Sequence, residues 1–299
     1  MNKLFSIVAL LFFFGLRFGF AENGEEPNQE AHQIEGSLQW KQGNIPLGDN
    51  LATLKVIPEF RYLAPTDAKK IIVDLWRNPP NNAQGILGMI FPSDVNPTDE
   101  TSWGVVITYN ADGFVKDDDA AKINYKDVLD KLQKTTQDAN AERTKQGYEP
   151  ISILGWATQP HYDRTSHKFY WAKELQFGTS QNHTLNYDIR VLGRKGVLVL
   201  RAVASMADFQ QIEARMPQVI SMVEFNSGNR YADFTPGTDK VAEYGLAALV
   251  LGGVAAKVGL FKGLIALLLA GKKFIILAVV AVGGFFTKMF RRKKRNDQA

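Results

Sequence analysis

The sequence of 299 residues contains no cysteine. This absence excludes structural disulfides, thiolate metal sites, iron–sulfur clusters and a cysteine nucleophile. It does not fix the cellular compartment, because an exported protein can fold without disulfides. The sequence also lacks a G-x-S-x-G motif, a Walker phosphate loop, a G-x-G-x-x-G run and an H-E-x-x-H pair. No enzyme class is therefore indicated by motif, and we expect no cofactor and no metal.

Acidic residues are scarce at both ends of the chain. Residues 1–21 hold two Lys or Arg and no Asp or Glu, and residues 244–299 hold ten and one. Of the 35 basic and 31 acidic residues in the chain, 23 and 30 remain in residues 22–243, a net charge of −7. A mildly acidic body has no nucleic-acid footprint, so we expect no nucleic-acid partner.

The N-terminus has the pattern of a secretory signal. Lys3 forms a short positive region, and the thirteen residues from Leu4 to Leu16 are mostly apolar. The small residues Gly19 and Ala21 predict cleavage before residue 22. A helix of this apolar length reaches about 20 Å, too short for the roughly 30 Å hydrocarbon core. We therefore predict a signal peptide over residues 1–21.

The C-terminus has the pattern of a membrane anchor. Residues 274–286 are apolar without interruption, and basic residues bound them on both sides. Counting snorkelling lysines, residues 272–292 reach about 31 Å, which is enough to span a bilayer. The cluster RRKKR at 291–295 favours the cytoplasmic side. We predict a transmembrane helix at 272–292 and a basic cytoplasmic tail at 291–299.

Residues 244–271 are also apolar, but Lys257 and Lys262 lie near their middle. Each lysine costs about 3 kcal/mol at a bilayer centre, so we predict an interfacial or half-inserted helix here. A second crossing would make 244–290 a helical hairpin, and that alternative stays open. Small residues recur at fourfold spacing, which favours close helix packing on the final span or on a second copy. They are Ala248, Gly252, Ala256, Gly259 and Gly263.

Between the two ends, short apolar runs alternate with turn residues. Strands are predicted at 51–57, 60–63, 86–91, 103–109, 151–158, 167–177, 185–192 and 197–203, with a hairpin formed by 37–41 and 45–47. Helices are predicted from Pro65 to Trp76 with Thr66 as cap, at 124–146, and at 207–225. Residues 22–36 are polar and predict a flexible leader. The 37–235 body is therefore α+β, with a largely antiparallel sheet and two or three packed helices.

Residues 155–175 concentrate aromatic and histidine side chains. A ligand groove is one interpretation; its lining would be Trp156, His161, Tyr162, Asp163, His167 and Trp171. The other interpretation places the aromatic residues in the core or in cross-strand pairs, with His161 in a solvated loop. Zinc binding is disfavoured, because no helix presents two ligands at the required spacing. Residues 108–119 resemble a calcium loop but lack its first Asp and last Glu, so an acidic solvated loop is expected instead.

Seven segments of the sequence together resemble a known family. They are GNIPLGDNLATL (43–54), DLWRNPP (74–80), SWGVVITY (102–109), DAAKINY (119–125), GYEPI…GWATQPHYD (147–163), HTLNYDIRVLGRKGVLVL (183–200) and RYADFTPGTDKVAEYGLAALV (230–250). The family they resemble is a bacterial one of uncharacterised membrane-anchored proteins, the domain of unknown function family 2167. The resemblance covers nearly all of the chain after residue 21 and implies an envelope protein anchored by its C-terminus, with no activity or site residue to carry over. A looser similarity of pattern is to the Mog1/PsbP-type fold.

These patterns favour an inner-membrane protein with a periplasmic domain and a cytoplasmic C-terminus. Our leading hypothesis is a non-enzymatic binding or scaffold module of a bacterial envelope assembly. Its expected partners are the lipid bilayer and other membrane or envelope proteins, including copies of itself. Two alternatives stay open: an envelope hydrolase or metal-dependent enzyme that uses the 155–175 stretch, and a subunit of a channel or transporter complex.

Overall fold

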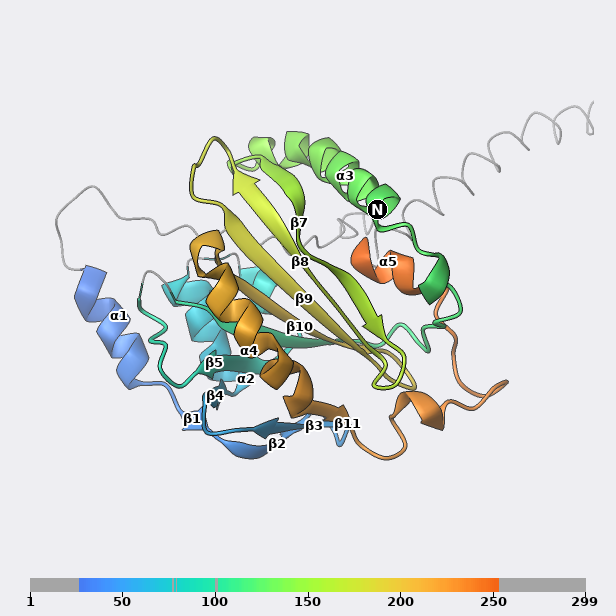
Figure 1. Ribbon diagram of the computed structural model, residues 1–299. Coiled ribbons are helices and arrows are strands. Elements are labelled where there is room, and N and C mark those ends of the chain that lie inside the picture. Colours follow the sequence, from blue (N-terminus) through green and yellow to red (C-terminus); the bar gives the residue numbers. More distant parts are fainter. Residues whose placement is uncertain (1–26, 77, 79, 100–101, 253–299) are drawn as a thin grey trace, which may run out of the picture. The chain divides into compact units, whose positions relative to one another are not determined.

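The computed structural model describes residues 27–76, 78, 80–99 and 102–252. Its largest element is an eight-stranded sheet in which every neighbouring pair is antiparallel (Figure 1). This confirms the α+β class with an antiparallel sheet. In sheet order the strands are β1 (Trp40–Lys41), β4 (Phe60–Leu63), β5 (Ile86–Pro92), β6 (Gly104–Asn110), β10 (Val197–Ser205), β9 (Thr184–Leu192), β8 (Lys168–Phe177) and β7 (Ile151–Asp163).

A second, smaller sheet and several helices pack around the large one. The small sheet has the order β11 (Val223–Phe225), β3 (Ala52–Val56), β2 (Gly43–Leu47). The α-helices are α1 (Pro27–Gly36), α2 (Pro65–Lys69), α3 (Tyr125–Lys145), α4 (Phe209–Met222) and α5 (Leu246–Val250). Helix α2 continues as a π-helical stretch, η1 (Lys70–Leu75), and four short 3-10 turns follow: η2 (Pro80–Ala83), η3 (Ala120–Lys122), η4 (Met206–Asp208) and η5 (Tyr231–Asp233).

Helix α3 shows how local sequence produces these elements. The side chain of Asn124 accepts a hydrogen bond from the backbone N–H of Lys126 at 3.0 Å, which satisfies one free donor at the helix start. Val128, Leu132 and Thr136 are buried at fourfold spacing and form one stripe. The predicted helix at 124–146 is thus confirmed to within a residue at each end.

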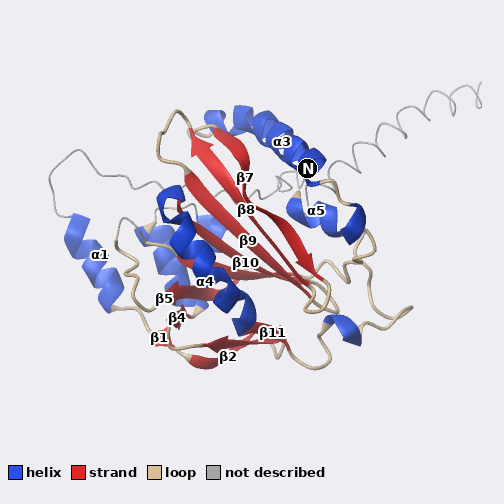
Figure 2. Cartoon of the chain, in the orientation of Figure 1, coloured by secondary structure: helices blue, strands red, loops and turns tan. Residues whose placement is uncertain are grey.

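Both faces of the large sheet are covered. Helix α4 and the small sheet cover one face, where they share an apolar cluster with the inward residues of the sheet (Figure 2). The other face packs on α3 and α5 at one side and on α2 and η1 at the other. Strand β9 therefore buries both of its faces: apolar residues toward α4 and polar residues on the opposite side. The apolar set is Leu185, Tyr187, Ile189 and Val191, and the polar set is Asn186, Asp188 and Arg190.

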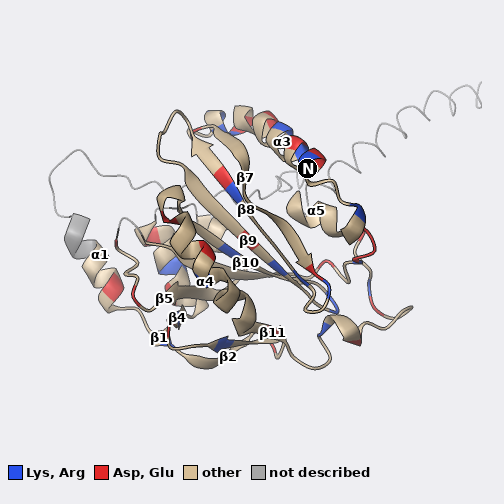
Figure 3. Ribbon diagram, viewed as in Figure 1, with Lys and Arg blue, Asp and Glu red and all other residues tan. Residues whose placement is uncertain are grey.

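Charged residues of β8 and β9 are consequently buried inside the domain. Figure 3 marks the positions of charged residues along the strands. One oxygen of Asp188 accepts hydrogen bonds from Arg201 at 2.7 Å and from Arg190 at 3.0 Å, and the other lies 3.3 Å from the Lys173 ammonium. Burial by itself raises the pKa of Asp188, but the three cations outweigh it and hold that pKa far below its ordinary value. The cluster is an ion network that joins β8, β9 and β10; Lys173, Asp188 and Arg190 are buried, and Arg201 is partly buried.

The hairpin predicted from residues 37–41 and 45–47 is wrong. Strand β1 pairs with β4 in the large sheet, whereas β2 pairs with β3 in the small one. Each run buries its apolar side chains in a different layer: Trp40 packs edge-on against Phe91, while Leu47 joins the cluster beneath α4. Strand propensity is local, but the choice of partner strand is set by which layer accepts the side chains.

Three further predictions differ from the structure. Residues 27–36 of the expected flexible leader form α1, in which Ile34 packs on the apolar cluster around η1 and Glu35 accepts a hydrogen bond from Asn96 at 2.7 Å. Thr66 does not cap α2, whose N-cap is Ala64 without a side-chain bond. The helix predicted over 207–225 ends at Met222, because residues 223–225 join β3 as β11.

The segment predicted to lie at the membrane interface begins inside the domain. Helix α5 buries Leu246, Leu249 and Val250 in the cluster shared with α3, so packing continues past the predicted domain end at residue 235. Of the small-residue series, Ala248 and Gly252 lie within the described chain. Ala256, Gly259 and Gly263 lie outside it, as do the predicted signal (1–21), transmembrane helix (272–292) and tail (291–299). Within residues 27–76, 78, 80–99 and 102–252, no helix is long and apolar enough to cross a membrane.

Candidate functional site

The six residues predicted to line a groove do not form one surface. Trp171 is fully buried in the core, and Trp156 is half-buried and donates a hydrogen bond to the carbonyl of Tyr125 at 3.2 Å. Trp171 belongs to the apolar cluster shared with α3 and α5, and Trp156 packs against that cluster. The pairing of β7 with β8 shifts register three times between Ile153 and His161. Bulges of this kind rotate successive side chains, so simple alternation does not assign them to faces.

His161 and Asp163 also leave the predicted groove. His161 lies within β7, opposite Tyr170, with the two rings 5.2 Å apart, and not in a loop as expected. Asp163 ends the strand and accepts hydrogen bonds from the N–H of Thr165 and the hydroxyl of Ser166, at 2.8 and 2.6 Å. Its carboxylate shapes the β7–β8 turn. These contacts are distinct from the one that joins the remaining pair, Tyr162 and His167.

Tyr162 and His167 meet at the end of this turn, together with an unpredicted carboxylate. The Tyr162 hydroxyl donates to Asp117 Oδ2 at 2.9 Å and lies 3.1 Å from His167 Nδ1. His167 Nδ1 is 3.9 Å from the same carboxylate oxygen. Asp117 comes from the loop between β6 and α3, so the cluster joins segments about 45 residues apart. We call Asp117, Tyr162, His167 and the adjacent Tyr231 the His167 cluster.

Tyr231 brings the C-terminal part of the domain into this cluster. Its ring stacks on the imidazole of His167 with centroids 4.0 Å apart and planes at 27°. Its hydroxyl donates to the carbonyl of Val115 at 3.0 Å. The ring of Phe114 continues the stack. Its centroid lies 4.4 Å from that of Tyr231 and 3.9 Å from that of Phe234. The aromatic ladder therefore fixes residues 231–234 against the same loop that supplies Asp117.

The hydrogen bonds select one tautomer of His167. Tyr162 has a single hydroxyl proton, which it donates to Asp117. The Tyr162 oxygen then accepts from Nδ1–H of His167, and the Nε2 lone pair is left to accept a proton or a donor group. Burial and Asp117 raise the pKa of Tyr162, so its hydroxyl stays protonated. The arrangement presents a neutral, oriented imidazole nitrogen on a ring that is 29% exposed.

The backbone of His167 is unusual as well. Its φ of +52° lies in the left-handed region, which only Asn50 shares among non-glycine residues of the described chain. Such a conformation costs on the order of 1 kcal/mol for a residue with a side chain and is frequent at functional sites. Here the stack on Tyr231 and the bond to Tyr162 hold it in place.

We expect acidification to weaken the fold through His167. Burial lowers the pKa of His167 below its ordinary value of 6.5, although Asp117 and Asp163 act in the opposite direction. The unfolded chain then binds the proton at higher pH than the folded protein does. The free energy of unfolding should therefore be at its full value above pH 6.5 and fall as the pH drops through that value.

Denaturant unfolding at about pH 7.5 and about pH 5.5 measures this loss. His167→Asn is the matched control, because asparagine tolerates a positive φ and does not titrate. The parent should lose more stability between the two pH values than the variant. An equal loss in both proteins would assign the pH dependence to other groups.

The loop that carries Asp117 also borders a hollow. It has a volume of ≈ 370 Å³ and is lined by Lys116, Asp118, Asp119 and residues 241–245. The acidic residues of the expected solvated loop have structural roles here: Asp119 accepts hydrogen bonds from the first backbone N–H groups of α5, and Asp112 accepts one from Tyr244 at 2.6 Å. In the part of the chain that the structure describes, no group of acidic and histidine residues is arranged to hold a metal ion.

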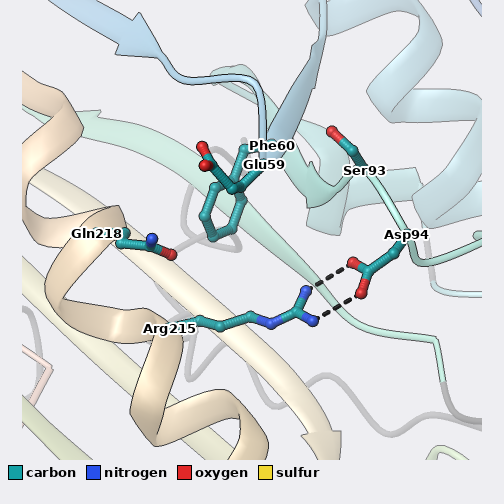
Figure 4. Close-up of a pocket in the computed structure, with 6 residues that line it drawn as sticks. All are labelled: Glu59, Phe60, Ser93, Asp94, Arg215 and Gln218. Carbon is teal, nitrogen blue, oxygen red and sulfur yellow. Dashed lines mark hydrogen bonds and ion pairs between the residues drawn. The ribbon is translucent and has the colours of Figure 1, made fainter.

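A second hollow of ≈ 310 Å³ lies between α4 and the ends of β4 and β5. Figure 4 shows Glu59, Gln218 and Arg215 arranged around the ring of Phe60. Arg215 donates to both oxygens of Asp94, each at 2.7 Å. This bidentate pair ties α4 to the loop after β5. The Phe60 ring itself is fully buried, so the hollow offers a polar rim without an accessible aromatic surface.

Comparison with known proteins shows the family of this chain. The model of a family described as "Protein of unknown function (DUF2167)" matches residues 39–283. The chain belongs to this family. The match spans the whole described domain from β1 onward and confirms the resemblance found in the sequence. No curated protein matches this DUF2167 chain.

The DUF2167 chain is similar to three solved structures. Cyanobacterial PsbP (CyanoP) from Synechocystis sp. PCC 6803 is 11% identical with a TM-score of 0.35, covering 63% of this chain and 92% of that one. LpqN of Mycobacterium tuberculosis, described as involved in cell envelope biogenesis, is 13% identical with a TM-score of 0.29. The match covers 67% of this chain and 99% of LpqN. The Ran-binding protein Mog1p of Saccharomyces cerevisiae is 10% identical with a TM-score of 0.31. The match covers 67% of this chain and 100% of Mog1p. PsbP and Mog1, the two proteins named in the fold expectation, are both among them.

Sequence reasoning on this DUF2167 protein missed Asp117 and Tyr231. Asp117 was included in an acidic loop, and Tyr231 lies far from the aromatic stretch. A usable signal was the segment beginning RYADF, one of the seven that carry the family resemblance. An aromatic residue within a short polar stretch, outside any strand or helix pattern, indicates a specific contact more than core packing.

Proposed function

We propose that this protein is an inner-membrane-anchored periplasmic module that binds or scaffolds an envelope partner through the His167 cluster. The observation that carries the binding role is the convergence of a strained, oriented His167 with Asp117 and Tyr162 and with Tyr231 from the C-terminal segment. The chain proceeds from this segment through α5 toward the predicted anchor. The signal and anchor patterns of the sequence support the location.

The location is tested with two measurements on the full chain. Protease added to intact spheroplasts should digest the domain, and a reporter fused after Ala299 should be active only in the cytoplasm. A periplasmic reporter signal would mean a helical hairpin at 244–290 instead of a single crossing. A protected domain would refute export itself.

The binding role is tested by purification in mild detergent. Partner recovery should fall for His167→Ala and for Tyr162→Phe, because each breaks the Asp117–Tyr162–His167 hydrogen bonds. His161→Ala is the matched control, since His161 lies on the same hairpin but outside the cluster. A monomer without partners in every sample, or an equal loss for His161→Ala, would contradict the proposal. The full chain is needed, because a fragment ending at residue 243 would lack the buried residues of α5.

A hydrolytic enzyme is the second candidate function. The observation that favours it is the free Nε2 of His167, whose proton-accepting form is set by the bond between Nδ1 and Tyr162. Under this hypothesis His167 is a general base and Tyr162 orients it. Hydrolysis of envelope substrates should then rise with pH as His167 loses its proton, and Tyr162→Phe should reduce kcat more than KM. Metal analysis of the purified protein separates a metal-dependent version from this one.

A further inference from the structure

A short segment that includes Tyr231 covers the imidazole of His167. The segment lies between two glycines with positive φ. Residues 229–234, here called the lid, contain η5 and carry Tyr231 and Phe234. Gly228 precedes the lid at φ +88°, and Gly237 lies in the exposed turn after it at φ +80°. A Cβ atom at either glycine would meet no atom within 4 Å, so these positions are glycine for backbone conformation and not for lack of space.

The lid is internally tied, which lets it move as a unit. Asp233 Oδ2 accepts hydrogen bonds from the N–H groups of Gly228 and Arg230, at 2.8 and 2.9 Å. The N–H of Asp233 donates to the carbonyl of Arg230 at 3.0 Å. The two bonds between Arg230 and Asp233 lie within the lid and stay intact when it rotates, whereas the bond from the Gly228 N–H joins the lid to its hinge. The chain on either side is fixed, by β11 in the small sheet and by the pairing of Val241 with Phe114.

The contacts between lid and body are few and specific. Tyr231 supplies the ring that covers His167 and the hydroxyl that bonds Val115, and Phe234 stacks on Phe114. Two backbone bonds cross the boundary, from Arg194 N–H to the carbonyl of Asn229 and from Asn229 N–H to the carbonyl of Asn226, each at 2.9 Å. The Asn229 side chain donates to the carbonyl of Asn50 at 3.1 Å, and Arg230 forms an isolated β-bridge with Gly193. Opening the lid breaks three ring contacts and a small number of hydrogen bonds, and it leaves the buried core of α5 and β11 untouched. Such low-cost segments are the ones that open locally in proteins.

We propose that residues 229–234 open about Gly228 and Gly237 and so admit a ligand to the imidazole of His167. The inference rests on the proposed binding role of the His167 cluster and adds its regulation. The ligand admitted carries a hydrogen-bond donor, because Nε2 of the oriented imidazole is an acceptor. Movement of the lid relative to the rest of the domain would change the access of a ligand to His167. Closure places the Tyr231 ring over one face of the imidazole and sets its orientation.

Acylation by diethylpyrocarbonate, followed by mass spectrometry of the full chain, tests the lid without a known ligand. The reagent modifies unprotonated imidazoles that it can reach, and the four histidines report separately. In the parent protein His167 should react more slowly than His161. In Tyr231→Ala the rate at His167 should rise about tenfold, the factor expected when a ring stack and a hydrogen bond no longer hold the closed state.

His183 is the internal reference, because it pairs with Glu174 on a different part of the sheet and should keep its rate. Tyr148→Ala, the loss of an exposed tyrosine far from the lid, should change neither histidine. An unchanged rate at His167 in Tyr231→Ala overturns the lid. A parallel rise at His183 would signal loss of the fold, and the next measurement then decides.

Amide hydrogen exchange on the unsubstituted full chain is the second test of the lid. The N–H of Arg194 bonds across the lid boundary to Asn229, whereas the N–H of its neighbour Gly193 bonds within the β9–β10 turn to Gly196. Lid opening exposes only the first, so Arg194 should exchange faster than Gly193. Equal protection of the two amides overturns the proposal. Neither measurement depends on membrane location or partner recovery, so failure of the lid and failure of the proposed function are distinguishable.

Discussion

Replacing Asp188 by alanine should destabilise the domain by about 3–5 kcal/mol, the usual cost of removing one partner from a buried charge network. Asp188 forms ion pairs with Lys173, Arg190 and Arg201, and it is 0% exposed. Its loss leaves cations buried between three adjacent strands. Against a total stability of about 5–15 kcal/mol for a typical domain, the variant should be largely unfolded or poorly recovered.

Urea unfolding at neutral pH measures this effect. Asp130→Ala is the matched control, since Asp130 makes a solvent-exposed ion pair with Lys126 on α3, and such pairs contribute little to stability. Asp188→Asn keeps the shape of the side chain and removes only its charge, so its cost separates the charge from the packing. A loss below about 1 kcal/mol for Asp188→Ala would mean that solvent reaches the network and that it is not buried as described.

Replacing Trp171 by alanine should lower the free energy of unfolding by about 3–5 kcal/mol, as expected for a large aromatic side chain removed from a tight core. Trp171 is 0% exposed and packs on Phe169 with ring centroids 5.0 Å apart. The Arg190 guanidinium also lies 5.0 Å from its ring. The substitution therefore removes core packing and, in addition, one neighbour of the buried charges.

Thermal unfolding of Trp171→Ala beside Trp156→Ala tests this assignment. Trp156 is half-buried and makes one hydrogen bond, so its loss should lower the melting temperature less. The result also decides between the two sequence interpretations of residues 155–175. A Trp171→Ala protein that kept the parent stability and lost only partner recovery would make Trp171 a binding residue and contradict its place in the core.

Much of the fold was predictable because local patterns carry it. Alternating runs predicted the strands that became β3–β6 and β8–β10, and the stripe through Val128 and Leu132 predicted α3. The failures came where a segment depends on a distant one. Residues 37–41 and 45–47 have strand propensity, yet they join different sheets because their side chains fit different layers. Polar residues 27–36 form a helix because the apolar cluster around η1 takes up Ile34.

The candidate site was predictable only in part. Tyr162 and His167 were chosen for residue type and lie in the site, but their proposed companions do not. The bulges in β7 turn His161 away from them, and burial removes Trp171. Asp117 and Tyr231 could not be assigned, since each is separated from His167 by about 50 residues or more of chain and is brought to it by antiparallel pairing of strands.

The amino-acid order alone determined the class of fold, the lack of thiol chemistry, the family and the positions of most strands, because each depends on composition or on contacts between near neighbours. Tertiary structure decided everything that depends on what covers a residue. In β9 the alternation of apolar and polar residues specifies a strand, but it cannot say whether the polar side meets water. Helices α3 and α5 and the α2–η1 segment cover that face of the sheet, and Asp188 and Arg190 become part of an interior ion network.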